Sequence, residues 1–251
     1  MVTDSDYLDT PEIQQLVEGG IRVLGDRRES LMHHKFMVID RQEVWTGSMN
    51  FTINGVYRND NNLIRIHSTE LAQDFTGEFE EMYVDDRFGD ASRADTPFPR
   101  LEMGGYPLQV YFSPDDGVAG HLEDLVTSAQ NSVEVLAYAF TLDSLADTLL
   151  QAAGRGVSVR GVFDAGQANE NLGSDYQRLL QAGLALRLDG NPNKMHHKVL
   201  VIDHRWVVLG SYNFSASAEQ NNDENVLILE NPEIADRFLQ EFERIYALAS
   251  P

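Results

Sequence analysis

Two octets with the same polar opening hold the residues best suited to chemistry. The chain reads HHKFMVID from His33 and HHKVLVID from His196. Each octet is an apolar run typical of a buried strand, yet it begins with two histidines and a lysine. Strand side chains alternate between faces, so Lys35 points the same way as His33, and Lys198 the same way as His196. Each octet therefore presents an imidazole and an ammonium group on one surface.

A hydroxyl and an amide follow each octet at the same two-residue spacing. They are Ser48 and Asn50 in the first copy and Ser211 and Asn213 in the second. If the copies face one another, two imidazoles meet among hydrogen-bond donors, which suits a tetrahedral, anionic phosphate. Displacement at phosphorus needs one imidazole to attack while the other protonates the leaving oxygen. The residue types therefore indicate phosphodiester chemistry, with the hydroxyl and amide groups as substrate-binding candidates.

The octets belong to an internal repeat with an offset of 163 residues. The match extends to Gly47 with Gly210 and to Asn62 with Asn225, and it continues into an apolar helical stripe near each copy's end. A match over such a span is not chance, so the chain contains a duplicated unit.

The order of predicted elements places both copies in an α/β fold. Each copy predicts a short helix, a strand, the octet strand, two further strands and a closing helix. The second copy also alternates strand, helix, strand, helix, strand over residues 106–163. We predict two lobes related by a pseudo-two-fold axis, with mixed sheets flanked by helices. The first lobe covers residues 1–88 and the second covers residues 106–251, while residues 89–105, rich in Pro, Gly and charge, form a linker.

The first lobe is expected to be truncated at its N-terminal side. The counterparts of residues 106–163 would lie before Met1, so this lobe lacks about three strands. Its sheet would have an open edge, which is an aggregation hazard. Three explanations are open: an upstream segment of a longer protein, a partner chain that completes the lobe, or another closure. We favour the upstream segment.

The doubled pattern resembles the signature of the phospholipase D superfamily, namely His-x-Lys, four residues and Asp, then six residues and Gly-Ser-x-Asn. The matching residues are His33, Lys35, Asp40, Gly47, Ser48 and Asn50 in the first copy and His196, Lys198, Asp203, Gly210, Ser211 and Asn213 in the second. The resemblance implies a two-fold bilobal fold and metal-free phosphodiester chemistry. It also implies a covalent phosphohistidine intermediate and a second histidine as general acid. Asp40 and Asp203 point away from the histidines, so we expect structural roles at the strand ends.

The same resemblance suggests a partner for one histidine. The segment NNDENVLIL resembles the family stretch that carries a glutamate orienting the catalytic ring, and Glu224 fills that position. The first copy has Asn61 there, which can accept a hydrogen bond but carries no charge. We expect Glu224 to raise the pKa of His196 and make it the acid, which leaves His33 as the nucleophile.

Composition excludes several kinds of site. Cysteine is absent, so disulfides and thiolate chemistry are excluded. Adjacent histidines on a strand face apart and lysine is a poor metal ligand, so we expect no metal and no cofactor. His34 and His197, which point opposite to the catalytic pair, are expected to be structural. No signal peptide or membrane-length apolar run is visible, so we expect no stable membrane insertion; a soluble protein, cytoplasmic or secreted, fits, and the compartment stays undetermined.

The substrate is less strongly indicated than the chemistry. GSMNFT and GSYNFS followed by NNDEN look most like the small bacterial endonuclease-type and phosphodiesterase members of the family. The formal net charge of −21 disfavours nucleic acid at low salt. We therefore predict a metal-independent, nuclease-like hydrolase, and keep two alternatives: a phospholipase D or phosphatidyltransferase acting on phospholipids, and a non-catalytic phosphate-binding scaffold.

Overall fold

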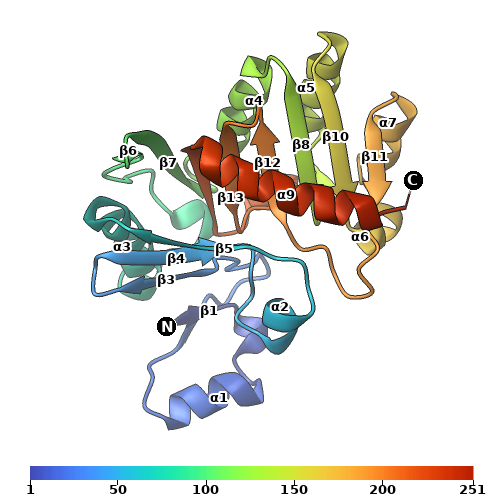
Figure 1. Cartoon of the computed structure of the whole chain (residues 1–251). Helices are drawn as coiled ribbons and strands as arrows, with labels where there is room; N and C mark the ends of the chain where they lie inside the picture. Colours follow the sequence, from blue (N-terminus) through green and yellow to red (C-terminus); the bar gives the residue numbers. More distant parts are fainter. Residues whose placement is uncertain (251) are drawn as a thin grey trace.

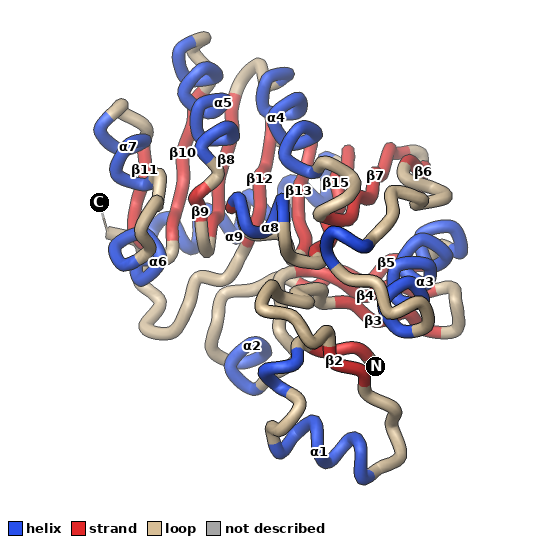
Figure 2. The backbone as a smooth tube through the Cα atoms, turned by 180° about the vertical axis from the view of Figure 1, so that it is seen from behind, coloured by secondary structure: helices blue, strands red, loops and turns tan. Residues whose placement is uncertain are grey.

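A computed structural model describes residues 1–250 and contains two main sheets (Figure 1). One sheet has eight strands and the other has three. The three-stranded sheet belongs to residues 1–88, here called the first lobe, and the larger sheet to residues 100–230, within the part called the second lobe (residues 89–250). Figure 2 shows both sheets from behind, with helices on both faces of the larger one.

The first lobe follows the predicted order of elements. It contains β1 (Val2–Thr3), η1 (Ser5–Tyr7), α1 (Pro11–Glu18), β2 (Leu24–Gly25), β3 (Phe36–Ile39), β4 (Glu43–Gly47), α2 (Ile53–Tyr57), β5 (Leu63–His67) and α3 (Thr69–Tyr83). Strands β3, β4 and β5 are antiparallel neighbours, while β1 and β2 form a separate parallel pair.

The second lobe adds the strand–helix alternation expected over residues 106–163. Its elements are η2 (Gly89–Ala91), β6 (Arg100–Met103), β7 (Tyr106–Ser113), α4 (Val118–Ser128), β8 (Ser132–Ala137), β9 (Phe140–Thr141), α5 (Asp143–Gly154), β10 (Ser158–Phe163), α6 (Ala165–Glu170), α7 (Tyr176–Gln181), β11 (Ala185–Leu188), β12 (Lys198–Ile202), β13 (Trp206–Gly210), β14 (Phe214–Ser215), α8 (Ala216–Gln220), β15 (Glu224–Glu230) and α9 (Pro232–Leu248). The sheet order is β11-β10-β8-β12-β13-β15-β7-β6, with β10 parallel to both neighbours and the other pairs antiparallel.

One strand lies in the stretch predicted to be linker. Arg100–Met103 forms β6, which pairs with β7 at the edge of the large sheet. The Pro, Gly and charge content of residues 89–105 marks the turns around this strand and hides its short alternating pattern. The linker is therefore shorter than predicted.

The lobes share one hydrophobic core. A cluster of buried side chains joins Val44 and Phe75 of the first lobe to Phe112 and Phe242 of the second. The rings of Phe75 and Phe112 meet edge to face with centroids 5.2 Å apart. A second cluster lies under α4, α5 and α7 and belongs to the second lobe alone. The shared cluster fixes the two octet strands relative to each other. Within residues 1–250 no helix combines the length and apolar character needed to cross a bilayer.

Tight hairpin turns end both octet strands. Asp40 and Arg41 each have φ of 53°, and the equivalent Asp203 and His204 have φ of 52° and 54°. Two consecutive residues with positive φ form the turn type that matches the twist of a two-stranded hairpin. Aspartate tolerates this conformation better than most residues, which accounts for its place at the end of each octet.

Candidate active site

Each octet strand is held at its start by the opposite copy of the repeat. The backbone N–H of His33 donates to the carbonyl of Asp223 at 3.0 Å, and that of His196 donates to the carbonyl of Asp60 at 2.8 Å. Asp60 and Asp223 are themselves 163 residues apart, so the two bonds repeat with the octets. This exchange brings the residue after each aspartate to the histidine of the other lobe.

Glu224 therefore contacts His33, the histidine of the first lobe. Its Oε2 lies 2.7 Å from Nδ1 of His33. The expectation that Glu224 orients His196 is wrong, because Asp223 pairs with the first octet and carries the next side chain across the lobe boundary. The glutamate has 0% of its surface exposed. Burial opposes its ionisation, but His33 and Lys35 outweigh burial and hold the pKa of Glu224 below its usual value.

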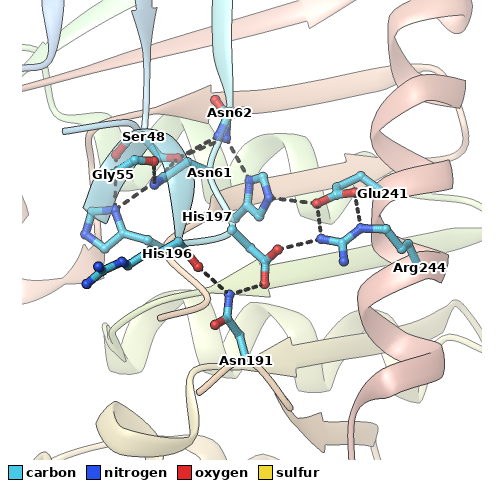
Figure 3. A network of polar contacts seen from close by, with 11 residues as sticks. Ser48, Gly55, Asn61, Asn62, Asn191, His196, His197, Glu241 and Arg244 are labelled. Atoms are coloured by element: carbon cyan, nitrogen blue, oxygen red, sulfur yellow. Dashed lines mark hydrogen bonds and ion pairs between the residues drawn. The ribbon is translucent and has the colours of Figure 1, made fainter. Parts of the chain in front are cut away.

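Asn61 makes the reciprocal contact with His196. Its Oδ1 lies 3.0 Å from Nδ1 of His196, and the carbonyl of Ser48 lies 3.1 Å from the same nitrogen (Figure 3). The amide of Asn61 is fixed because its Nδ2 donates to the carbonyl of Gly55 at 2.9 Å. Both partners of the ring are acceptors, so the proton sits on Nδ1 and Nε2 is left as the reacting atom. The carboxylate beside His33 imposes the same tautomer there.

The two lysines are buried beside the histidines. Lys35 Nζ donates to the carbonyl of His33 at 2.6 Å, and Lys198 Nζ donates to the carbonyl of His196 at 2.9 Å. Only 5% of Lys35 and 1% of Lys198 is exposed. Burial lowers the pKa of Lys35 to about 8, even though Glu224 acts in the opposite direction. Burial, reinforced by Lys35, lowers the pKa of Lys198 further.

The pKa of both histidines is lowered in the folded protein. Burial is the main cause that lowers the pKa of His196, and the positive charges of Lys198 and Lys35 lower it further. The pKa of His33 is also lowered by burial, although Glu224 opposes the shift. Both rings are therefore neutral at neutral pH when the site is empty. The two lysines beside these rings give the site a positive charge, which the negative charge of a phosphate would balance.

The two serines of the motif hold the neighbouring loops. Ser48 Oγ donates to Asn61 Oδ1 at 3.0 Å and accepts from the N–H of Asn62 at 3.1 Å. Ser211 Oγ accepts from the N–H of Asn225 at 3.0 Å. Both serines are fully buried. They position the residues that contact the histidines, and direct contact with substrate stays a prediction.

The glycines before these serines are required by close packing. Gly47 has φ of +154° and Gly210 has φ of +152°. A Cβ atom would lie 2.4 Å from the carbonyl oxygen of Asn62 at the first position and 2.1 Å from that of Asn225 at the second. Asn50 and Asn213, the amides of the motif, are half-buried. Within residues 1–250, Oδ1 of Asn213 is buried without a hydrogen-bond partner.

The motif aspartates lie outside the site. Asp203 accepts backbone N–H groups of Gln130, Asn131 and Ser132 at 2.9, 2.6 and 2.9 Å. Burial opposes its ionisation, but these bonds outweigh burial and lower the pKa of Asp203. This carboxylate ties the octet hairpin to the start of β8. Asp40 is exposed at the equivalent turn, so both have positions consistent with a structural role.

The second histidine of each octet connects strand to helix. Nε2 of His34 lies 2.8 Å from Glu78 on α3, and Nε2 of His197 lies 3.4 Å from Glu241 on α9. His197 also meets Asn62 of the first lobe at 3.0 Å, and Arg244 links Glu241 to Asp60 (Figure 3). These contacts join the lobes behind the catalytic pair and support the structural role predicted for His34 and His197.

Sequence reasoning missed the exchange between lobes. The repeat matches Asn62 with Asn225, and this match indicated that the two segments around these residues share a function. Periodicity describes contacts within a strand, whereas the bonds from Asp60 and Asp223 join segments more than 130 residues apart. Tyr138 was missed as well. Its ring lies against His196 with centroids 4.6 Å apart, and no motif residue indicates this.

Comparison with known proteins identifies the family. A family model described as cardiolipin synthase, PLD-like domain, matches residues 3–83 and 122–246. The chain belongs to the phospholipase D superfamily. The two matched segments cover both octets and both closing helices and leave out the region around β6 and β7, which confirms the resemblance deduced from the motifs.

Curated relatives in this superfamily include both hydrolases and phospholipases. The chain is 40% identical over 124 residues to the mitochondrial cardiolipin hydrolase of Homo sapiens, covering 49% of each chain. It is 35% identical to that of Chlamydomonas reinhardtii over 123 residues, 49% of this chain and 55% of the relative. It is 30% identical over 151 residues to a phospholipase D of Rickettsia bellii, 58% of this chain and 75% of the relative. The chain thus spans about half the length of the two cardiolipin hydrolases.

Solved structures show the same fold. Nuc, a phospholipase D family member from Salmonella typhimurium, superposes with a TM-score of 0.54 at 30% identity, covering 57% of this chain and 95% of Nuc. Phosphatidylserine synthase from Haemophilus influenzae superposes with a TM-score of 0.67 at 14% identity, covering 88% of this chain and 62% of the synthase. The second likeness extends over both lobes and supports the fold alone.

Proposed function

We propose that this protein hydrolyses phosphodiesters without a metal, through a covalent phosphohistidine on His33. The observation that carries the proposal is the contact between Nδ1 of His33 and the buried Glu224 at 2.7 Å. Attack by Nε2 creates a positive charge on the ring, and the carboxylate stabilises that charge as it forms. His196 has a neutral amide instead, which gives no such stabilisation. The structure thus favours the nucleophile expected from the sequence, for the opposite electrostatic reason.

In the first step, the lone pair on Nε2 of His33 forms a bond to phosphorus while the bond to the leaving oxygen breaks. Nε2–H of His196 gives its proton to that oxygen, so an alcohol leaves. Lys35 and Lys198 place positive charge beside the phosphoryl oxygens. In the second step, His196 takes a proton from water, the hydroxide attacks phosphorus, and the bond between phosphorus and His33 breaks. The products are an alcohol and a phosphomonoester.

His196 must gain a proton before it can act as the acid. Without substrate, burial is the main cause that lowers its pKa, and the charges of Lys198 and Lys35 lower it further. A bound phosphodiester brings a negative charge into this cationic surrounding and favours protonation of the ring. The acid is therefore charged only when substrate is present, and its low intrinsic pKa makes proton transfer to the leaving oxygen favourable.

Nucleic acid is the first candidate substrate, and the likeness to Nuc supports nuclease-like hydrolysis. A phospholipid is the second candidate because of an apolar surface on α2. Ile53, Val56 and Tyr57 are 69%, 49% and 81% exposed. The same helix provides the Gly55 carbonyl that fixes Asn61, so this surface adjoins the site. The equivalent positions of the second lobe carry Ala216, Glu219 and Gln220, so lobe symmetry does not require apolar residues there.

The third candidate, a non-catalytic scaffold, has less support. Both lobes place a histidine and a buried lysine at equivalent positions, with a hydrogen-bonded partner on each histidine Nδ1. Burial of two lysine side chains costs stability, so a functional requirement is needed to explain why both are kept. A phosphate-binding function alone would need the cations and would not need an ordered tautomer on each ring.

The test measures hydrolysis of bis-p-nitrophenyl phosphate, single-stranded DNA and phosphatidylcholine vesicles with EDTA present. We expect release of p-nitrophenolate that is insensitive to EDTA and is lost in His33→Ala. Faster cleavage of DNA than of phosphatidylcholine supports the nuclease-like candidate, and the reverse order supports the lipid candidate. Loss of all activity with EDTA would contradict the proposed mechanism.

We also propose that a further segment covers the first lobe. Within residues 1–250, no strand pairs with the outer edges of β3 and β5, whereas β8 and β7 pair with the equivalent edges of β12 and β15. Support comes from apolar side chains that are exposed in the first lobe and buried at the equivalent positions of the second, namely Met37, Ile39 and Phe51 against Leu200, Ile202 and Phe214. An upstream segment or a partner chain with the architecture of residues 106–163 would complete the lobe.

A further inference from the structure

The ring of Tyr138 lies beside three basic side chains on one side of the site. Its ring centroid lies 4.6 Å from that of His196, 4.7 Å from Nζ of Lys198 and 5.3 Å from Nζ of Lys194. The main chain of Tyr138 is held next to the second octet because its N–H donates to the carbonyl of His197 at 2.9 Å. Tyr138 follows β8 directly, so a rigid strand positions the ring beside the general acid.

Lys194 brings to this ring a positive charge that the proposed reaction does not use. It is one of only three lysines in the chain, and the other two are Lys35 and Lys198 of the octets. Its side chain is exposed, and within residues 1–250 it forms no ion pair with a carboxylate. The neighbouring Tyr138 raises the pKa of Lys194 above the ordinary lysine value, so the group is charged at neutral pH.

This arrangement is present on the His196 side alone. The position equivalent to Lys194 in the first lobe is Leu31, which is 39% exposed. The first lobe also has no counterpart of Tyr138 within residues 1–250, because the equivalent of β8 is absent there. The asymmetry matters because the proposed reaction gives the two histidines different roles: His33 attacks the phosphate, and the leaving group departs on the side of His196.

We propose that Tyr138 and Lys194 form a subsite for a second phosphate carried by the leaving group. The inference rests on the proposed function, in which His196 protonates that group. Lys194 Nζ and the His196 ring lie against the same aromatic ring, so they are separated by no more than the sum of their two distances to it. A short spacer such as one sugar or one glycerol can bridge such a gap. The substrate class is therefore a diester with a neighbouring phosphate, rather than one with an uncharged alcohol.

Binding of small phosphates tests this subsite without any need for turnover. Calorimetry at low salt compares thymidine 3′,5′-bisphosphate with the 3′- and 5′-monophosphates on the wild-type protein. We expect the bisphosphate to bind about five- to tenfold more tightly than either monophosphate, beyond the twofold statistical factor, from one added cation–phosphate contact. The advantage should shrink at 1 M salt, where the Debye length is about 3 Å.

Matched variants assign the advantage to Lys194. Lys194→Leu, which installs the residue found at the first-lobe position, should abolish the preference for the bisphosphate and leave monophosphate affinity unchanged. Arg237→Leu removes one exposed positive charge from α9 and should keep the preference. Lys194→Arg should restore it. An equal affinity for mono- and bisphosphates in the wild-type protein, or a preference that survives Lys194→Leu, would overturn the proposal.

Two glycerol phosphates distinguish a polynucleotide from a lipid as the source of the second phosphate. Glycerol 1,3-bisphosphate is compared with glycerol 3-phosphate under identical conditions. A Lys194-dependent preference in the nucleotide pair supports a polynucleotide leaving group, and one in the glycerol pair supports a lipid with two phosphates. The absence of a preference in both pairs overturns the subsite. Failure of the proposed function shows separately, as absence of a covalent intermediate in a protein that still binds phosphate.

Discussion

Phe51 and Phe214 occupy equivalent positions of the repeat in very different surroundings. Phe214 is 1% exposed and packs against Phe140, with ring centroids 5.6 Å apart, whereas Phe51 is 50% exposed. The octet strands differ in the same way. Met37 and Ile39 are 41% and 43% exposed, while the equivalent Leu200 and Ile202 are fully buried.

The site end of the lobes shows no such difference. Lys35 and Lys198 are both buried, and each donates to the carbonyl of its own histidine. The contrast shows that the site depends on contact between the lobes and on the shared core. Within residues 1–250, the outer layer of helices and strands is present in the second lobe only. It buries apolar surface there, whereas the hydrogen bonds to the histidines come from other elements.

The largest expected difference concerns stability. Phe214→Ala should lower the free energy of unfolding by about 3–5 kcal/mol, because it empties a packed position in the core. Phe51→Ala should change it by less than about 1 kcal/mol, because the side chain already contacts water. Denaturant unfolding followed by circular dichroism measures both. Similar losses for the two variants would show that the first lobe buries Phe51 in solution.

The next effect concerns the unequal partners of the two histidines. Glu224→Gln removes the charge that stabilises the cationic ring of His33, so kcat should fall on the order of 100-fold. Asn61→Ala removes one neutral hydrogen bond to His196, so the fall should be about fivefold. Steady-state hydrolysis of bis-p-nitrophenyl phosphate provides the measurement. A larger loss for Asn61→Ala would reverse the proposed roles of the histidines.

A smaller effect separates the two motif aspartates. Asp203→Asn keeps the turn but weakens acceptance of three backbone N–H groups, so unfolding should become easier by about 1–3 kcal/mol. Asp40→Asn should change stability by about 0.5 kcal/mol or less. Because the pKa of Asp203 is lowered in the folded state, its contribution exists above the unfolded value and is lost as pH falls through the folded one. The difference in stability between Asp203→Asn and the wild-type protein should therefore close in acid.

The smallest effect is a pH dependence of substrate binding. Lys35 is charged below its pKa of about 8 and loses its charge as pH rises through that value. KM should therefore increase severalfold between pH 7 and pH 9.5, as one cation is lost from the phosphate site. Lys35→Gln should bind substrate weakly at every pH and show no such rise. A flat KM profile in the wild-type protein would contradict the charge assigned to Lys35.

Local patterns predicted the hairpins of each lobe correctly. The two further strands predicted after the first octet are β4 and β5. Alternation within four or five residues is enough for this, because the signal lies inside one strand. The strand β6 escaped detection because its stability comes from pairing with β7 in the sheet.

The partner of Glu224 could not be predicted from spacing. Its distance from His196 along the chain suggested a contact within one lobe, and the structure places it against His33, 191 residues away. Two copies of one motif allow contacts within a copy or between copies, and both agree with the repeat. The choice depends on the packing of Asp60 and Asp223 across the lobe boundary, which is a tertiary property.

Trapping of the covalent intermediate tests the central claim most directly. In His196→Ala, bis-p-nitrophenyl phosphate still has a good leaving group, so His33 can attack, but no base remains to activate water. We predict a burst of one equivalent of p-nitrophenolate per protein and a stable adduct that peptide mass spectrometry, after an alkaline quench, assigns to His33. The same experiment with His33→Ala should give neither burst nor adduct. A phosphoryl group on His196, or a burst that persists without His33, would contradict the account.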